Sequence, residues 1–270
     1  MMKTYTVPPR GFFIGNLEIT FYGLLMAFAM LVGIAIACRL AKKRGIKSDD
    51  IIMLAVIVLP CAIIGARLYY FIFNSVSFRE FFNFRDGGLA VLGGVIGGII
   101  GIVIFCAIKK NFKMLIDLFD ICVPALIMGQ AIGRIGCFFS QCCYGELVTD
   151  LSKCWFPLAE LIETYEGSGV YQWHLATNLY ESLWNFVGFV PVLLSFIKSK
   201  EKLTPTATYL IWYGFGRALI EGMRGDSLFI GNSPIRVSQA LSIVMLLIGV
   251  GLLVWNLVKT IRKRKTIVKQ

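Results

Sequence analysis

Runs of about 20 apolar residues recur along the sequence, and short basic segments separate them. A helix of that length crosses a hydrocarbon core of roughly 30 Å. Lipid offers no water to bond backbone amides, so a spanning segment satisfies them within its own helix. The composition agrees, because 57% of the residues are hydrophobic, too many for the surface of a water-soluble domain. We therefore expect an all-α integral membrane protein.

The apolar runs predict seven transmembrane helices within a single membrane domain that covers residues 1–270. The fourth helix is the least regular, because it includes Asp117, Asp120 and Pro124, and we expect it to be tilted, broken or partly interfacial. After it, residues 133–173 are polar enough to form a small external head or arm that is partly helical. The seven expected helices are 17–38, 51–73, 89–108, 114–132, 176–197, 206–224 and 237–258.

The net charge of +11 comes largely from four short basic clusters between apolar runs. Such a pattern is topological, because cytoplasmic loops are enriched in lysine and arginine. It predicts membrane lipids as neighbours and no nucleic acid. With every cluster inside, seven helices place the N-terminus outside and the C-terminus in the cytoplasm, whereas six helices would reverse the C-terminus. The clusters are Lys42, Lys43, Arg44 and Lys47; Lys109, Lys110 and Lys113; Lys198, Lys200 and Lys202; and Arg262, Lys263, Arg264 and Lys265.

Glycines repeat every four residues in the third expected helix, at Gly93, Gly97 and Gly101. This spacing puts them on one face, where a second helix backbone can approach closely. We interpret the row as a packing surface between helices. The alternative is that a lipid chain lies against it.

Ionisable residues inside apolar runs are informative, because charge within a membrane is costly. Glu221 follows Arg217 by four positions and precedes Arg224 by three, which predicts a ladder on one side of the sixth helix. Two arginines and one glutamate carry a net positive charge. A guanidinium group binds a phosphate through two hydrogen bonds. The phosphate of a phospholipid headgroup in the outer leaflet is therefore a candidate ligand of this ladder. Alternatively, Glu221 only neutralises arginines that reach the interface. Arg67 is a further ionisable residue inside an apolar run, in the second helix.

Residues 133–145 combine glycines, Arg134 and three cysteines at the outer end of the fourth helix. Irregular backbone is tolerated at membrane depth only inside protein or beside a polar cavity, so Arg134 is expected to be a third cation of the site. Four outer cysteines, at positions 137, 142, 143 and 154, lack the paired C-x-x-C motifs of structural zinc sites. We expect no metal and no cofactor. The other cysteines, Cys38, Cys61, Cys106 and Cys122, are interpreted as small core residues.

His174 is the single histidine and precedes the fifth expected helix. A lone histidine near an interface usually serves as an anchor. Histidine also exchanges protons readily near neutral pH, which makes His174 a candidate general base. Both interpretations stay open.

In their order along the chain, these residues resemble the prolipoprotein diacylglyceryl transferase family. The segment from Gly133 to Gly145 is similar to the family signature, with a glycine-arginine start, a second glycine three residues on and a closing glycine. The resemblance implies transfer of a diacylglyceryl group from phosphatidylglycerol to the lipobox cysteine of a preprolipoprotein signal peptide, in the bacterial cytoplasmic membrane. Glycerol phosphate is released. Further matches are Tyr22-Gly23, Gly65, Arg67, Tyr70, Gly87-Gly88-Leu89, Gly93-Gly94, His174, Leu179-Tyr180-Glu181, Tyr213-Gly214, Arg217, Glu221 and Arg224.

Three positions depart from the family pattern. Leu92 stands where members commonly have histidine, Cys137 where they have asparagine, and Cys142 where they often have glutamate. We interpret the cysteines as small fillers; alternatively they hydrogen-bond in place of the usual groups or relay the diacylglyceryl group covalently. Two other functions stay open: a non-catalytic lipid or lipopeptide binding paralogue, and an outer-face thiol oxidoreductase using Cys142 and Cys143.

The resemblance and the charge pattern together nominate a set of site residues. Those assigned to catalysis are Arg134, Arg217, Glu221, Arg224 and His174. Those assigned to substrate binding are Tyr22, Arg67, Gly136, Cys137, Cys142, Gly145, Tyr180 and Glu181.

Overall fold

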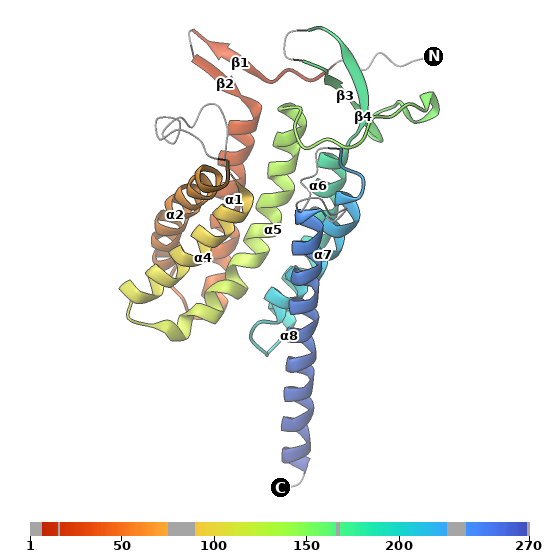
Figure 1. The fold of residues 1–270 in the computed structure, drawn as a ribbon. Helices are drawn as coiled ribbons and strands as arrows, with labels where there is room; N and C mark the ends of the chain where they lie inside the picture. Colours follow the sequence, from red (N-terminus) through yellow and green to blue (C-terminus); the bar gives the residue numbers. More distant parts are fainter. Residues whose placement is uncertain (1–6, 16, 75–89, 166–167, 226–235, 269–270) are drawn as a thin grey trace. The chain divides into compact units, whose positions relative to one another are not determined.

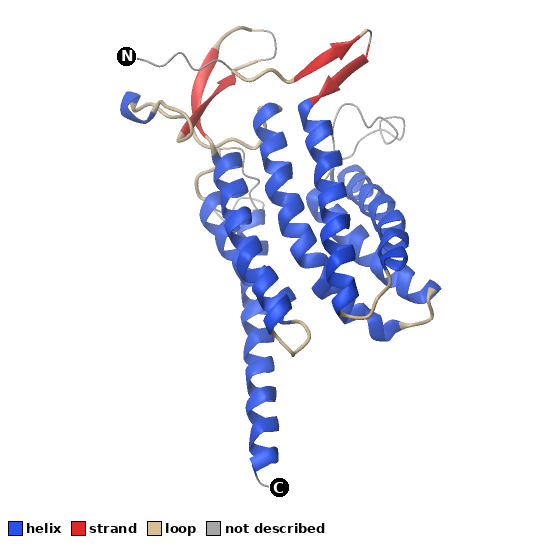
Figure 2. Cartoon of the chain, turned by 180° about the vertical axis from the view of Figure 1, so that it is seen from behind, coloured by secondary structure: helices blue, strands red, loops and turns tan. Residues whose placement is uncertain are grey.

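The computed structural model describes residues 7–15, 17–74, 90–165, 168–225 and 236–268. Within these ranges the chain is mostly helical and carries two β-hairpins (Figures 1 and 2). The helices are α1 (Phe21–Lys43), α2 (Ser48–Asn74), α4 (Val91–Ile108), α5 (Leu115–Phe139), α6 (Thr177–Lys198), α7 (Thr204–Glu221) and α8 (Val237–Val268). The strands are β1 (Gly11–Ile14), β2 (Leu17–Thr20), β3 (Ala159–Glu163) and β4 (Tyr171–Leu175).

The chain divides into two compact units. Residues 1–33 together with 123–270 form one, here called the site unit. Residues 34–122 form the other, here called the glycine unit. The single membrane domain expected from the sequence stays a prediction.

Each of the seven expected helices overlaps a helix of the structure; most ends are displaced by five residues or fewer, whereas α5 and α8 extend further, to Phe139 and Val268. Five of them are long and apolar enough to cross a membrane, and Leu92–Ile108 is a shorter apolar helix. The irregular fourth helix is continuous as α5, with Pro124 inside it. A helical multi-pass membrane protein is thus confirmed, whereas the number of spans and their direction stay predictions. The expected matches at Gly87, Gly88 and Leu89 fall outside the described residues.

The all-α class is wrong at two places in the site unit. Residues 17–20 were expected to begin the first helix, but they form β2 and pair antiparallel with β1. The sequence Leu-Glu-Ile-Thr alternates apolar and polar side chains, which suits a strand. The expected arm at 133–173 is helical at its start and then forms the β3–β4 hairpin, whose register pairs Glu160 with His174. Both hairpins lie at the same end of the site unit (Figures 1 and 2).

In the glycine unit, α4 packs on α2 along the expected glycine row. A Cβ on Gly97 would lie 2.2 Å from the carbonyl oxygen of Cys61, and one on Gly93 would lie 2.3 Å from that of Gly65. A side chain at either position therefore requires the two backbones to separate. The packing interpretation of the row is confirmed.

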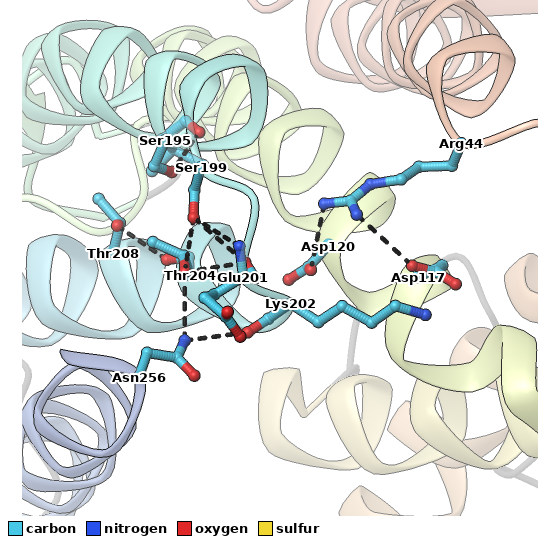
Figure 3. A network of polar contacts seen from close by, with 11 residues as sticks. Arg44, Asp117, Asp120, Ser195, Ser199, Glu201, Lys202, Thr204, Thr208 and Asn256 are labelled. Carbon is cyan, nitrogen blue, oxygen red and sulfur yellow. Dashed lines mark hydrogen bonds and ion pairs between the residues drawn. The ribbon is translucent and has the colours of Figure 1, made fainter. Parts of the chain in front are cut away.

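Ion pairs tie the two basic loops of the glycine unit together. Arg44, after α1, lies 3.8 Å from both Asp117 and Asp120 at the start of α5 (Figure 3). Lys109, at the end of α4, lies 2.5 Å from Asp50 at the start of α2. Asp120 is fully buried, so its partner offsets a large desolvation cost. The first two basic clusters therefore share one end of this unit.

In the site unit, two tryptophans fix how α6 crosses α7. The rings of Trp184 and Trp212 stack with centroids 4.7 Å apart. Each indole N–H donates to the other residue's backbone carbonyl at 3.0 Å. Gly188 and Gly216 leave space for these rings, since a Cβ on either would lie about 2 Å from an indole nitrogen. This crossing places the polar residues of the two helices opposite one another.

The turn between α6 and α7 is closed by hydrogen bonds at the opposite end of the site unit from the hairpins (Figure 1). Thr204 donates its hydroxyl to the carbonyl of Glu201 and accepts from Ser199, and Asn256 of α8 donates to Lys202 and Thr204 (Figure 3). Glu201 also pairs with two lysines of α8. The third and fourth basic clusters therefore share this end.

Candidate functional site

The site is organised around Glu181, on the first turns of α6. Its Oε1 lies 2.9 Å from Nη2 of Arg134 on α5, and its Oε2 accepts from Nη1 of Arg217 on α7 at 2.8 Å. Nη2 of Arg217 lies 2.8 Å from Oε2 of Glu221. We call these four residues the Arg–Glu cluster. Three helices thus contribute to one chain of ion pairs.

The Arg–Glu cluster is largely shielded from solvent. The side chains of Glu181 and Glu221 are 4% and 2% exposed, and those of Arg134 and Arg217 are 16% and 13% exposed. Buried charges are stable only when paired and hydrogen-bonded. The pairing keeps both guanidinium planes fixed while leaving each arginine partly accessible, which is the state required for binding an anion.

The expected ladder on α7 is wrong at Arg224. The helix ends at Glu221, and Arg224 lies beyond it, where its backbone forms an antiparallel bridge with Gly145. Arg217 and Glu221 do pair as expected. Arg236 approaches the same region, since it donates to the backbone carbonyl of Glu221.

Positive charge exceeds negative charge in this region. Arg134, Arg217, Arg224 and Arg236 are four cations against the two buried carboxylates of the Arg–Glu cluster, an excess of two that becomes one when the exposed Glu146 is counted. An exposed glutamate, Glu146, lies 4.0 Å from Arg236. The region therefore attracts an anion such as a phosphate.

Further polar and aromatic contacts join residues of α5, α6 and α7 in the site unit. Gln130 donates to the hydroxyl of Tyr209 at 3.0 Å, and the ring of Tyr209 stacks 5.6 Å from that of Tyr213. Ser182 donates to the carbonyl of Ala131. Of these residues, only Tyr213 was singled out by the sequence, as part of the family resemblance.

The end of α5 brings Cys137 and Cys142 together. The amide of Cys142 donates to the carbonyl of Cys137 at 3.0 Å, and that of Gln141 donates to Phe138. With Gln141 at a φ of 51°, this is a Schellman motif, in which the residues at these two positions touch. Cys143, at a φ of 60°, turns the chain again. The sulfurs of Cys137, Cys142 and Cys143 all lie within 4.8 Å of one another.

This cysteine turn is anchored on the start of α6. The carbonyl of Cys143 accepts from the Thr177 hydroxyl at 2.9 Å, and that of Cys142 accepts from the Asn178 amide at 3.4 Å. Hydrogen bonds with Cys137 and Cys142 lower the pKa of the Cys143 thiol, and the charges of Arg134 and Arg224 act in the same direction. The positive charge of the site therefore extends to the thiols.

Gly145 occupies a crowded position where a side chain has no space. A Cβ there would lie 2.7 Å from Leu175 and 2.8 Å from both Thr177 and Met223. Its carbonyl also faces Nδ1 of His174 at 2.9 Å. The glycine is required because three segments of the chain meet at this residue.

His174 lies in β4 and contacts the loop after the cysteine turn. Its ring lies 4.7 Å from that of Tyr144, and its Nδ1 carries the proton that Gly145 accepts. Its backbone also bridges to Leu147. These contacts suit the anchor interpretation, while the role of a base stays a prediction.

The other nominated residues divide between the two units. In the site unit, Tyr22 of α1 packs on Gly136, where an added Cβ would lie 3.1 Å from its ring. Tyr180 donates its hydroxyl to the carbonyl of Leu158. Arg67 lies in the glycine unit, buried, with its guanidinium 5.9 Å from the Tyr70 ring centroid. Leu92 is also in that unit, in α4.

Glu160 is a buried carboxyl that the sequence did not nominate. It lies in β3, is 1% exposed and accepts a hydrogen bond from Asn178 at 2.8 Å. Burial raises the pKa of Glu160 to about 8, against the opposing effect of the Asn178 hydrogen bond. Because Asn178 also bonds the carbonyl of Cys142, this carboxyl supports the cysteine turn.

The raised pKa of Glu160 predicts a pH-dependent stability. A carboxyl whose pKa is higher in the folded than in the unfolded chain holds an extra proton when folded. Stability should therefore be highest in acid and fall as the pH rises from the unfolded value of about 4.3 to about 8. In Glu160→Gln this fall should shrink, which thermal unfolding of both proteins across that range will measure. Equal pH dependence in the two proteins would refute the assignment.

Comparison of the sequence with known proteins identifies the family. The family model for prolipoprotein diacylglyceryl transferase matches residues 9–255. A phosphatidylglycerol–prolipoprotein diacylglyceryl transferase of Lactiplantibacillus plantarum is 38% identical over 90% of this chain and 87% of its own length. Proteins of the same name from Streptococcus suis and Clostridium botulinum are 37% and 35% identical, over 98% and 93% of this chain and 96% and 97% of their own lengths. The chain therefore belongs to the prolipoprotein diacylglyceryl transferase family.

Proposed function

We propose that this protein transfers a diacylglyceryl group from phosphatidylglycerol to the lipobox cysteine of a preprolipoprotein. The observation that carries the proposal is the Arg–Glu cluster, in which Glu181 fixes Arg134 and Arg217 on two different helices. Two guanidinium groups held in this way match the geometry of a phosphate. The names of the relatives identify phosphatidylglycerol and prolipoprotein as their substrates, which supports the proposal.

In the proposed reaction, Arg134 and Arg217 bind the phosphate of phosphatidylglycerol, and Arg224 adds positive charge beside it. The acceptor thiol loses its proton, and its sulfur attacks the glyceryl carbon that carries the phosphate. The C–O bond breaks and glycerol phosphate leaves, with its growing negative charge stabilised by the same arginines. His174, Glu221 and a phosphate oxygen of the substrate remain candidates for the base.

The proposed setting is the outer face of the bacterial cytoplasmic membrane, with seven spans and the C-terminus inside. Positive charge in the loops supports this direction. In the site unit, the basic α6–α7 turn lies at the opposite end from the hairpins (Figure 1). Glu181 of the Arg–Glu cluster lies on the first turns of α6, directly after β4 in the chain. In this setting the lipobox of the signal peptide reaches the site at the outer face of the membrane, after the preprolipoprotein has been translocated.

Labelling with an impermeant thiol reagent on intact cells tests this topology. A cysteine introduced at the exposed Ser152 should react, because residues 133–173 are external in the proposal. A cysteine introduced at the exposed Lys47 should be protected until the cells are opened. The unaltered chain controls for labelling of the native cysteines. Protection at position 152 together with labelling at position 47 would reverse the topology.

The function itself is tested in cells depleted of their own transferase. Expression of this chain should restore lipoprotein maturation, and purified protein should release glycerol phosphate when supplied with phosphatidylglycerol and a lipobox peptide. Lipid binding without release of glycerol phosphate would identify a non-catalytic binding protein. Thiol oxidation without release would instead favour an oxidoreductase.

A further inference from the structure

Three thiols gather beside the Arg–Glu cluster, and the proposed reaction does not use them. Cys137, Cys142 and Cys143 are half-buried, and their sulfurs lie within 4.8 Å of one another. Of these three cysteines, Cys137 and Cys142 depart from the family pattern, and the fold places the sulfur of Cys143 beside theirs. The three cysteines form no C-x-x-C motif in the sequence. They come together because the Schellman turn after α5 brings Cys142 and Cys143 back beside Cys137.

We propose that Cys137, Cys142 and Cys143 bind a thiophilic divalent cation, zinc first, as three thiolate ligands with one coordination position left for the acceptor thiol. The identity of that acceptor thiol rests on the proposed function, whereas binding of the cation is independent of it.

The geometry suits zinc. At a Zn–S distance of about 2.3 Å, tetrahedral thiolates lie roughly 3.8 Å apart, so small side-chain rotations bring the three sulfurs into range. The backbone that carries them is already held, because Thr177 and Asn178 bind the carbonyls of Cys143 and Cys142. Thiolate ligands favour zinc over the oxygen-preferring divalent cations.

The charges also suit a metal with three thiolates. Three thiolates and one divalent cation leave a single negative charge, which the nearby cations Arg134 and Arg224 offset. Sites with three protein ligands keep the fourth position open for a reacting group, whereas structural zinc sites use four protein ligands. No fourth ligand lies within the group among the described residues.

The open position gives the site a chemical role. An acceptor thiol that binds there releases its proton to solvent, since a thiol coordinated to zinc is deprotonated. Its sulfur then attacks the glyceryl carbon, a C–S bond forms, the C–O bond to phosphate breaks, and glycerol phosphate leaves. The ion remains on the three cysteines, and no oxidant or reductant takes part. This route supplies the acceptor thiolate without a general base.

Zinc content of the purified protein tests the binding site. Under a phosphine reductant, wild type should retain about one zinc ion per chain against a chromophoric chelator. The triple variant Cys137→Ser, Cys142→Ser, Cys143→Ser should retain none. Cys154→Ser is the matched control, because Cys154 lies in the same external segment with its thiol directed to the carbonyls of Val148 and Asp150. Equal zinc retention in wild type and the triple variant would overturn the proposal.

A second variant guards against a folding defect. Cys137→Asn with Cys142→Glu installs the side chains common in the family, so it should fold with the unfolding temperature of zinc-free wild type and fail to retain zinc. If it keeps zinc with wild-type affinity, the three-thiolate site is refuted.

Cobalt replaces zinc with a visible spectrum and reports the open position. Adding a lipobox peptide to cobalt-loaded wild type should raise the thiolate-to-cobalt charge-transfer absorption by about one third, because a fourth thiolate joins three. The same peptide with serine in place of cysteine should leave the spectrum unchanged. An unchanged spectrum with the cysteine peptide refutes the role of the fourth position.

The two proposals fail in different ways. Transfer activity in a chain that never binds zinc overturns the inference and leaves the function intact. Zinc bound by the three cysteines in a chain that transfers nothing supports the metal site and removes the proposed function.

Discussion

Arg134→Lys should lower diacylglyceryl transfer by about 100-fold or more, the effect of losing one preorganised donor to a developing charge. The formal charge is unchanged. Arg134 has to contact Glu181 through one nitrogen, at 2.9 Å, while presenting its remaining N–H groups to the phosphate. A lysine ammonium is a compact donor without the planar fork, so it cannot make both contacts in the same geometry.

The measurement is glycerol phosphate release from phosphatidylglycerol with a lipobox peptide as acceptor. Arg10→Lys provides the matched control, because Arg10 lies in the same unit with a 40% exposed side chain, 3.9 Å from Glu163. Lysine keeps the charge, and an ion pair at this distance with a partly exposed arginine contributes little, so this variant should retain wild-type activity. Unfolding temperatures of both variants separate catalysis from folding. Wild-type turnover in Arg134→Lys would exclude Arg134 from phosphate binding.

Glu181→Gln should both unfold more easily and lose transfer activity. Glu181 is the shared partner of Arg134 and Arg217, and its side chain is 4% exposed. Removing one member of a buried ion pair leaves its partner charged and poorly solvated, at a cost of about 3 to 5 kcal/mol. A glutamine offers one acceptor oxygen and no charge, so the two guanidinium groups repel one another and lose their fixed orientation.

The matched control for this change is Glu160→Gln, at another buried carboxyl of the same unit. Because burial already raises the pKa of Glu160 to about 8, an uncharged amide there should cost little at neutral pH. Glutamine also keeps an oxygen that accepts from Asn178. Thermal unfolding and transfer assays on the two variants give the comparison. Equal losses in both would show that Glu181 has no special place in the site.

The helices were predictable from the sequence because the hydropathy of a segment indicates whether it lies in lipid, and a segment in lipid has to be helical. All seven expected ranges overlap helices of the structure, since apolar side chains and internally bonded backbone determine them without reference to the rest of the chain. The α2–α4 packing was predictable for a related reason. Glycines four apart define a face of their own helix before any partner is known.

The β1–β2 and β3–β4 hairpins were not found, because each is short and lies beside strong helical signals. Residues 17–20 are apolar enough to be read as the start of the first helix. Four alternating residues are too few to outweigh the apolar run that follows them, and the pairing of Gly11 with Thr20 and of Phe13 with Glu18 is what establishes the strand. Strand pairing depends on a partner segment, and composition does not carry that information.

Within the site, the sequence by itself determined which ionisable residues matter, and the tertiary structure decided how they combine. Arg217 and Glu221 stand out because charge inside an apolar run is costly, and Arg134 stands out because it lies in the glycine-rich segment 133–145. Glu181 was nominated only through the family resemblance, yet it joins Arg134 and Arg217 because the Trp184–Trp212 stack fixes the crossing of α6 and α7. The three thiols meet because a Schellman turn reverses the chain after α5. Residue spacing along a helix predicts which side chains are neighbours within that helix. Contacts between two elements depend on how helices cross and how the chain turns, because these set the distances between their side chains.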